Sequence, residues 1–411
     1  MLNFLYALFY HAVHLDGKGG VPMSVLGIVA EYDPFHNGHL HHLRSSVSAV
    51  SPSAVLAVIS GPFRQRGTLS LLSPFARAEC AVAAGVDAVF SLPVLWTLRD
   101  AEHYALGAVS LLSSLGATHI SFGAETADLF LLQTTADLLE DPPSMFQETL
   151  HAALADGAGY PAAVTSAARA CNPEAGALLR HPNNILAVSY LRAIRRLSSH
   201  LIPVVIPRTG GYVSDRVFPD APSASSVTEA LRRGDWADAL TALPPFSRQI
   251  VRSDFLSGTI PDLRKLDILL LEKLRSLCPE EVAALPDCAE GLNASLLKSA
   301  VHASSRDDLI LRLTSRRYAS ARISRLCAYA LLDITKKGIE EEPLPYRALL
   351  LAMKKNPSLT GSWKSGSVQV FTVAKWLKNV SPADLAAWRI WSLCCGKTDA
   401  WPFEKKLITN C

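Results

Sequence analysis

Short apolar runs alternate with amphipathic stretches along the first half of the chain. The runs occupy residues 25–30, 54–59, 88–93 and 119–123, with a later candidate at 203–206. The amphipathic stretches occupy residues 38–50, 74–84 and 100–115. Apolar runs of this length are typical of strands buried on both faces, and the longer stretches between them are typical of helices. The alternation predicts a parallel sheet with helices on both faces.

The second half of the chain has a different pattern. From about Ser223 onward the spacing is helical, with breaks at prolines such as Pro279 and Pro343. We expect an α/β fold: a Rossmann-like parallel sheet over residues 23–218, followed by a mainly α-helical C-terminal region over residues 219–411. Residues 1–22 read as an N-terminal extension, and we hypothesise that Met23 is the natural start because the first strand follows it directly.

Composition narrows the class of protein. Of 411 residues, 49% are hydrophobic and 19% are charged, so a large core is possible and global disorder is not expected. A net charge of +3 does not by itself imply nucleic acid binding, so any basic surface must be local. The eight cysteines lack zinc-type spacing, which predicts no metal site, reduced thiols and a cytoplasmic location. No apolar run is long enough to predict a membrane-spanning helix.

The loop after the first strand carries the clearest chemistry. His36-Asn37-Gly38-His39 leads from the strand end into a helix, whose N-terminus has free N–H groups and attracts anions. Gly38 lets the backbone approach a phosphate closely. Two histidines on one turn can both donate hydrogen bonds to phosphate oxygens, and such bonds accelerate a reaction if they tighten at a pentacovalent phosphorus. We therefore predict ATP binding, with His36 and His39 as catalytic residues.

This loop resembles the HxGH signature of the nucleotidylyltransferase superfamily. Further segments resemble one family within it, the bacterial tRNA(Met) cytidine acetate ligases. These segments are Glu31 to His39, Ser60 to Gly67, Phe122 to Glu125, Pro182 to Leu186, Arg208 with Gly211-Tyr212, Ser223 to Ser226, Glu290 to Leu292, and Arg316 to Tyr318 leading to Ile323. The resemblance extends from about Val25 to Leu332 and implies a Rossmann-like nucleotidylyltransferase sheet.

The resemblance also implies an activity. Members of the family join acetate to ATP as acetyl-adenylate and pass the acetyl group to the wobble cytidine of elongator tRNA(Met), with ATP as substrate and Mg²⁺ expected with it. No obligate protein partner is implied. The implied ATP-binding positions are Val29, Ala30, Glu31, Tyr32, Asp33, Pro34, Phe35, His36, Asn37, Gly38, His39, Leu40, His41, His42, Gly123, Asn183 or Asn184, and Arg208.

Basic residues elsewhere are candidates for tRNA contacts. Arg64 and Arg66 follow the second strand and open on the same edge of the sheet as the histidine loop, although a solvated loop charge is the plain alternative. Tyr318, Arg322, Arg325 and Tyr329 are spaced to share one stripe of a helix, where arginines could contact phosphates and tyrosines could stack on bases. Arg316 and Arg317 add local positive charge just before this helix.

Two features leave alternatives open. The family usually has an asparagine at the position of Asp33, and a carboxylate near phosphates would repel them unless it points away or helps to hold magnesium. The histidine loop alone would also suit a nucleotidylyltransferase that makes a small phosphorylated cofactor precursor, or a non-catalytic nucleotide-binding module. Such small-molecule enzymes are usually compact single domains, which would leave the long helical region without a purpose.

Overall fold

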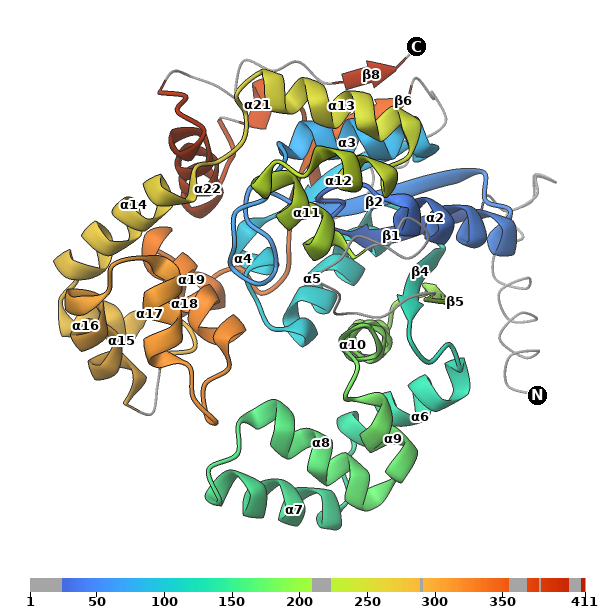
Figure 1. Cartoon of the computed structure of the whole chain (residues 1–411). Coiled ribbons are helices and arrows are strands. Elements are labelled where there is room, and N and C mark those ends of the chain that lie inside the picture. Colours follow the sequence, from blue (N-terminus) through green and yellow to red (C-terminus); the bar gives the residue numbers. More distant parts are fainter. Residues whose placement is uncertain are drawn as a thin grey trace.

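The computed structural model describes residues 24–208, 223–288, 291–354, 368–376, 378–398 and 408–410. The expected extension over residues 1–22, the expected boundary between residues 218 and 219, and the Gly211-Tyr212 pair lie outside these residues. Eight strands form one sheet at the centre, with helices on both of its faces (Figure 1).

The strands are β1 (Val25–Ala30), β2 (Ala54–Ser60), β3 (Ala88–Leu92), β4 (His119–Ala124), β5 (Ile202–Pro207), β6 (Arg347–Lys354), β7 (Gln369–Phe371) and β8 (Ile408–Asn410). Their order is β5-β4-β1-β2-β3-β6-β7, and β8 also pairs with β6. The five strands from β1 to β5 are parallel to their neighbours among themselves, which confirms the predicted sheet. Each predicted strand lies within one residue of its observed bounds.

The helices described are α2 (Asn37–Val50), α3 (Pro74–Ala84), α4 (Val94–Thr97), α5 (Ala101–Ser114), α6 (Leu129–Glu140), α7 (Ser144–Ala155), α8 (Tyr160–Cys171), α9 (Pro173–Leu178), α10 (Pro182–Arg196), α11 (Ala224–Arg233), α12 (Trp236–Thr241), α13 (Pro245–Leu256), α14 (Leu263–Ser276), α15 (Pro279–Ala284), α16 (Leu292–His302), α17 (Arg306–Leu313), α18 (Ser320–Leu331), α19 (Lys336–Glu340), α21 (Val373–Trp376) and α22 (Pro382–Cys394). None of them is both long and apolar enough to cross a membrane.

Strand β2 shows why the run at residues 54–59 contains only apolar side chains. Leu56 and Val58 belong to the core that contains α5 and α10, whereas Val55, Ala57 and Ile59 belong to the core that contains α2 and α3. All five side chains are buried because helices cover both faces of the strand. The helix–strand alternation of the sequence therefore corresponds to two cores divided by one sheet.

The C-terminal region is mainly helical as expected, but it also supplies strands that the sequence pattern did not reveal. Strand β6 pairs antiparallel with β3 and so covers an edge of the parallel sheet. Its residues alternate between the same two cores: Ala348 and Leu350 lie in one, Leu349 and Leu351 in the other. A short apolar run fits a buried strand as well as a buried helix, which is why this strand was missed.

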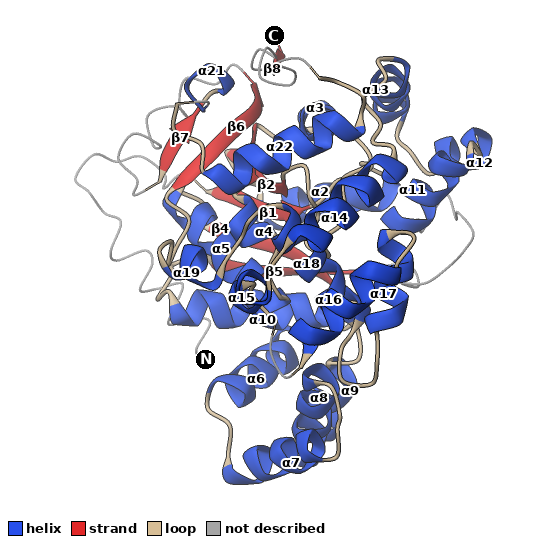
Figure 2. Cartoon of the chain, turned by 90° about the vertical axis from the view of Figure 1, so that its left-hand side faces the viewer, coloured by secondary structure: helices blue, strands red, loops and turns tan. Residues whose placement is uncertain are grey.

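Two further groups of helices pack into the same core as α5. Helices α6 to α9 lie together below the sheet in Figure 1, and α14 to α19 lie beside α4. The turned view places α7 and α8 at the opposite end of the molecule from β6, β7 and β8 (Figure 2). The two groups touch where a side chain at Gly159 would lie 2.9 Å from the carbonyl oxygen of Arg316.

Candidate active site at the end of the first strand

The strand order creates a crevice beside β1. The chain proceeds from β1 to β2 and β3 on one side, and β4 and β5 lie on the other side. Loops that leave β1 and β4 therefore diverge, and such a switch point is where open α/β sheets bind ligands. The loop after β1 contains His36 to His39, and the loop after β4 contains Glu125. Sequence motifs far apart in the chain thus meet at one edge of the sheet.

His36 and His39 form a stacked pair at the start of α2. Their ring centroids are 3.6 Å apart with an interplanar angle of 18°. The main-chain N–H of His36 donates to Nδ1 of His39, and the main-chain N–H of His39 donates to Nδ1 of His36, both at 3.3 Å. This reciprocal cap occupies two of the N–H groups that a helix start otherwise leaves unpaired.

The cap fixes which ring nitrogens carry protons. A nitrogen that accepts a hydrogen bond carries no hydrogen, so each neutral ring holds its proton on Nε2. Burial, reinforced by the positive charge of Arg208, lowers the pKa of His36 to about 3. Burial also holds the pKa of His39 well below its ordinary value, with His36 and Arg208 adding to the effect. The pair is therefore neutral at pH 7 and offers two Nε2–H donors.

The carboxylate of Asp33 points away from the histidine pair. It is 1% exposed, and its two oxygens accept hydrogen bonds from the main-chain N–H groups of Leu71 and Leu72 at 2.8 and 2.9 Å. Arg64 Nη1 lies 3.7 Å from the same carboxylate. Of the two alternatives that the sequence left open for Asp33, the geometry favours the one in which the carboxylate is directed elsewhere, because its oxygens are already engaged.

Arg77 on α3 bonds to the ends of both β1 and β2. Its guanidinium is fully buried and donates to the carbonyl oxygens of Glu31, Ser60 and Gly61 at 2.8, 2.9 and 2.5 Å. The arginine therefore provides hydrogen-bond donors to carbonyl groups at the ends of β1 and β2.

The loop after β4 separates the two candidate asparagines. The side chain of Asn184 is fully buried and bonds to Thr126 and to the carbonyl oxygen of Leu178. Asn183 is half-buried; Glu125 accepts from its amide nitrogen at 2.6 Å, and its amide oxygen accepts from Arg208 at 3.2 Å. Asn183 therefore faces the crevice beside Arg208, while the amide of Asn184 is used to shape the loop.

Gly123 on β4 lies against Arg208, the residue that follows the neighbouring strand β5. A side chain at Gly123 would place its Cβ 3.0 Å from Cγ of Arg208, so the glycine makes room for the arginine. Arg208 is exposed, and its positive charge acts on His36, His39 and His42 alike. One exposed cation thus faces three neutral histidines, an arrangement suited to an anionic ligand.

The remaining predicted positions of the loop are placed as follows. Tyr32, Pro34 and Phe35 are buried; Val29, Ala30, Glu31, Asn37, Gly38, Leu40 and His42 are half-buried; His41 is exposed. The rings of Tyr32 and Phe35 pack on the ring of His39, with centroids 5.0 and 5.7 Å away. The two buried aromatic rings therefore hold the ring of His39 in place.

No pattern in the sequence predicted the contacts that α11 and α12 make with the histidine loop. The main-chain N–H of Asn37 donates to the carbonyl oxygen of Ala242 at 2.8 Å, and its side-chain amide donates to the carbonyl oxygen of Thr241 at 3.2 Å. The hydroxyl of Thr228 donates to the carbonyl oxygen of Asp33 at 2.9 Å. Such contacts link residues about 200 positions apart, which no local pattern can show.

Arg64 and Arg66 lie on a loop between the crevice and α18. Nε of Arg64 donates to the Thr68 hydroxyl at 2.9 Å, so this side chain is held within the loop. Arg66 is exposed, and its carbonyl oxygen accepts from the hydroxyl of Ser324 on α18. Only Arg66 of the two is placed on the open surface.

Two of the four residues in the predicted stripe on α18 are buried, so less of it reaches the surface than expected. Tyr318 and Arg322 are half-buried and lie together, with the guanidinium carbon 5.3 Å from the ring centroid. Tyr329 is buried and donates to the carbonyl oxygen of Leu98, and Arg325 is 9% exposed and lies 3.7 Å from Asp287. The expectation of an exposed Arg325 and Tyr329 was wrong, because α18 packs on its neighbours over a wider face than the apolar residues alone indicated.

Arg316 and Arg317 lie on the open surface just before α18. Arg316 is 71% exposed and forms an ion pair of 2.9 Å with Asp156, a residue at the end of α7. This pair joins the two helical groups at the surface. The positive charge that the sequence placed here is therefore accessible.

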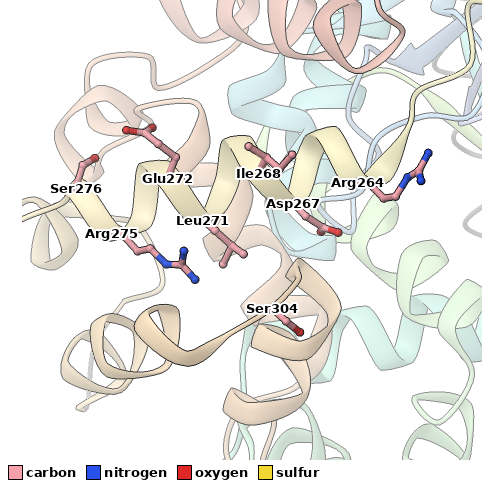
Figure 3. Close-up of a pocket in the computed structure, with 8 residues that line it drawn as sticks. All are labelled: Arg264, Asp267, Ile268, Leu271, Glu272, Arg275, Ser276 and Ser304. Carbon is pink, nitrogen blue, oxygen red and sulfur yellow. The ribbon is translucent and has the colours of Figure 1, made fainter.

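A surface hollow of about 700 Å³ lies on α14, away from the histidine loop (Figure 3). It is lined by Arg264, Asp267, Ile268, Leu271, Glu272, Arg275, Ser276 and Ser304. Two of its charged side chains form hydrogen bonds with neighbouring helices. Arg275 donates to the carbonyl oxygens of Ala300 and Ala303, and Asp267 accepts from the main-chain N–H of Arg306. We assign it no chemistry for this reason.

Comparison with known proteins decides the family. The model of the HIGH Nucleotidyl Transferase family matches residues 23–398. A tRNA(Met) cytidine acetate ligase from Fervidobacterium nodosum is 32% identical over 397 residues, covering 94% of this chain and 93% of that protein. The chain belongs to the tRNA(Met) cytidine acetate ligase family of HIGH nucleotidyl transferases. A relative of the same name from Caldanaerobacter subterraneus is 36% identical over 324 residues, covering 78% of this chain and 80% of that protein.

Solved structures of a relative share the fold of this chain. The crystal structure of Thermotoga maritima TmcAL bound with alpha-thio ATP aligns with a TM-score of 0.86 and 28% identity, covering 94% of this chain and 99% of that one. An apo form of the same protein aligns with a TM-score of 0.88 and 27% identity, with the same coverage. The nucleotidylyltransferase-type fold and the family expected from the sequence are both confirmed.

Proposed function

We propose that this chain is an ATP-dependent ligase that activates acetate and transfers the acetyl group to the wobble cytidine of elongator tRNA(Met). An acetate oxygen attacks the α-phosphorus of ATP, a phosphorus–oxygen bond to the leaving pyrophosphate breaks, and acetyl-adenylate forms. The exocyclic amine of cytidine then attacks the acetyl carbon, AMP leaves, and the amine loses a proton. The curated relatives carry the name of this reaction, and a solved relative holds an ATP analogue.

One observation carries the adenylation step: the stacked His36–His39 pair at the start of α2. The pair offers two neutral Nε2–H donors beside an exposed arginine and a helix N-terminus. Donors held in place before the reaction stabilise negative charge that develops on phosphate oxygens, with no reorganisation at the moment of reaction. The buried Tyr32 and Phe35 hold the pair, so its geometry is set by the core.

We further propose the binding roles of the surrounding residues. Residues 29–42, Gly123, Asn183 and Arg208 would bind ATP, with Asn184 shaping the loop. Arg66, Arg316, Arg317 and Arg322 would contact tRNA, while Arg64 and Arg325 would hold those surfaces in place. No group of three acidic, histidine or cysteine ligands occurs among the described residues, so we propose that Mg²⁺ arrives bound to the phosphates of ATP. We also propose that the chain acts on tRNA in the cytoplasm and needs no obligate protein partner.

Release of pyrophosphate from ATP tests the proposal. Release that requires acetate, and that continues with AMP formation when tRNA(Met) is added, is the expected result. Release that requires a phosphorylated small molecule would instead indicate an enzyme that makes a cofactor precursor. No consumption of ATP under either condition would leave only a nucleotide-binding module.

A further inference from the structure

A closed set of three hydrogen bonds surrounds His42, one turn beyond His39 on α2. The hydroxyl of Ser46 donates to the carbonyl oxygen of His42 at 2.7 Å. The hydroxyls of Ser46 and Ser121 lie 2.7 Å apart, and the Ser121 hydroxyl lies 3.2 Å from Nε2 of His42. Ser121 belongs to β4, so these bonds join α2 to the strand on the other side of the crevice.

Counting protons fixes the direction of every bond in this set. A carbonyl oxygen only accepts, so the single proton of Ser46 is used on His42. The proton between the two hydroxyls must then come from Ser121. With that proton used, the contact between Ser121 and the imidazole can only be a bond donated by Nε2–H of His42.

The ring of His42 is also neutral. Burial lowers its pKa to about 4, and the positive charge of Arg208 contributes, followed by His41. A neutral ring with its proton on Nε2 has a lone pair on Nδ1. Among the residues that the structure describes, none is bonded to this nitrogen, and the ring is only half-buried.

We propose that His42 is the hydrogen-bond acceptor of the ATP site and receives a neutral O–H or N–H group of the nucleotide on Nδ1. This inference rests on the proposed use of ATP. His36 and His39 carry protons on Nε2, whereas His42 has a lone pair on Nδ1, so His42 repels phosphate oxygens and selects a different part of the same ligand. The matching chemistry in ATP is a ribose hydroxyl or the adenine amine. The two serines act as positioning residues, since they determine which nitrogen is left free.

The tautomer can be observed directly in the intact protein. Long-range ¹H–¹⁵N spectra distinguish an Nε2–H from an Nδ1–H imidazole, and the His42 signals are assigned by their loss in His42→Phe. We expect an Nε2–H imidazole that stays neutral at pH 7 in the unliganded protein. An Nδ1–H imidazole or an imidazolium at this pH would overturn the proposal.

Calorimetric titration with two probes tests the ligand. His42→Phe keeps an aromatic ring and removes both nitrogens, so it should bind ATP about tenfold more weakly, the effect of one lost hydrogen bond. Its affinity for inorganic triphosphate, which has no such donor, should be unchanged. An equal loss for both probes would make His42 a phosphate ligand, and no loss for either would remove it from the site. Each of these results overturns the proposal.

Analogues identify the donor group. The unmodified protein should bind one of 2′-deoxy-ATP, 3′-deoxy-ATP or the triphosphate lacking the adenine amine about tenfold more weakly than ATP, and His42→Phe should not discriminate against that analogue. Absence of discrimination against all three would contradict the proposal. Ser48→Ala, on the exposed side of the same helix, is the matched control and should behave as wild type. None of these measurements uses acetate or tRNA, so their failure and a failure of the ligase proposal are separate results.

Discussion

At the scale of single residues, the site depends on where protons and charges are held. The reciprocal cap leaves His36 and His39 as Nε2–H donors, and the two serines leave His42 as an acceptor. Asp33 is turned toward main-chain N–H groups and adds its negative charge to Arg64 instead of to the ligand. The sequence places these side chains in one loop, and their hydrogen bonds determine which of them donates, which accepts and which anchors the loop.

His39→Ala tests the donor role. Because Nε2–H of His39 would bond most strongly to the transition state, we expect acetate-dependent pyrophosphate release to fall by about 10²–10³-fold. Affinity for tRNA(Met) should be unchanged, since the exposed arginines lie elsewhere. Wild-type turnover by this variant would remove the histidine pair from the mechanism.

Asp33→Ala tests the anchoring of the loop. The change leaves the N–H groups of Leu71 and Leu72 buried without acceptors, so the free energy of unfolding should fall by about 3 kcal/mol in urea titrations. Asp33→Asn keeps one acceptor oxygen and should lose less. If the carboxylate instead faced the phosphates, either variant would bind ATP more tightly at unchanged stability, contrary to our account.

Acid pH should destabilise the fold through His36. Burial lowers the pKa of this side chain from 6.5 to about 3. As pH falls below 6.5, His36 therefore becomes protonated in the unfolded chain but stays neutral in the folded chain, which favours unfolding. Stability is complete above pH 6.5 and is lost progressively toward pH 3. Between pH 7 and 5 the wild type should lose about 2 kcal/mol more than His36→Asn, which keeps a capping side chain.

Denaturant titrations at several pH values measure this difference. His151→Asn, a change at an exposed position on α7, serves as the control and should follow the wild type. Parallel pH profiles for the wild type and His36→Asn would show that His36 is not held neutral by burial.

Sequence could identify the histidine pair but not its surroundings. A strand end, a glycine and two histidines on a turn are local features, so His36 and His39 were predictable. Whether Asn183 or Asn184 faces the crevice depends on Glu125 and Thr126 from another strand loop. The same holds for Asp33, whose partners lie about 38 residues away.

At the scale of elements, helices from the C-terminal region hold the histidine loop after β1 and the loop after β2 in place. Helix α12 binds the start of α2 through Asn37, and the loop at Gly67 packs on α18. The periodic elements were predicted well because both faces of β1 to β4 are buried and their apolar runs are uninterrupted. Strand β6 was missed because its run of five buried residues lies in a region otherwise rich in helices.

Gly67→Ala tests the junction between this loop and α18. Gly67 has a positive φ of 76°, and an added Cβ would lie 2.6 Å from the carbonyl oxygen of Ser324. Gly157 has a similar φ of 79° with nothing near the added Cβ, so Gly157→Ala measures the backbone cost alone, about 1 kcal/mol. We expect urea unfolding to show a clearly larger loss for Gly67→Ala. Equal losses would mean that the loop does not press on α18.

At the scale of the whole molecule, the sheet edge that holds the histidine pair is joined to two helical groups bearing exposed arginines. Arg316 and Asp156 connect these groups at the surface. A net charge of +3 hides this local positive surface, which is why composition could not predict it. The stripe on α18 was only partly predictable, because apolar periodicity does not show that an arginine such as Arg325 is buried beside Asp287.

Arginine substitutions should separate tRNA contacts from structural roles. Arg316→Ala and Arg317→Ala should each weaken tRNA binding and reduce the slope of log affinity against log salt by about 1, measured by filter binding. Arg325→Ala should instead lower the free energy of unfolding, because it leaves Asp287 without its buried partner. Arg264→Ala, at a position 88% exposed, is the control. Salt slopes unchanged in both surface variants would exclude this surface as the tRNA contact.

Transfer of labelled acetate to tRNA tests the central proposal most directly. The purified chain, ATP and radiolabelled acetate are incubated with elongator tRNA(Met), or with the same transcript carrying uridine in place of the wobble cytidine. We predict ATP-dependent incorporation into the first transcript and none into the second, and incorporation about 10²–10³-fold slower with His39→Ala. Equal labelling of both transcripts, or no labelling of either while ATP is converted to AMP, would contradict the proposed function.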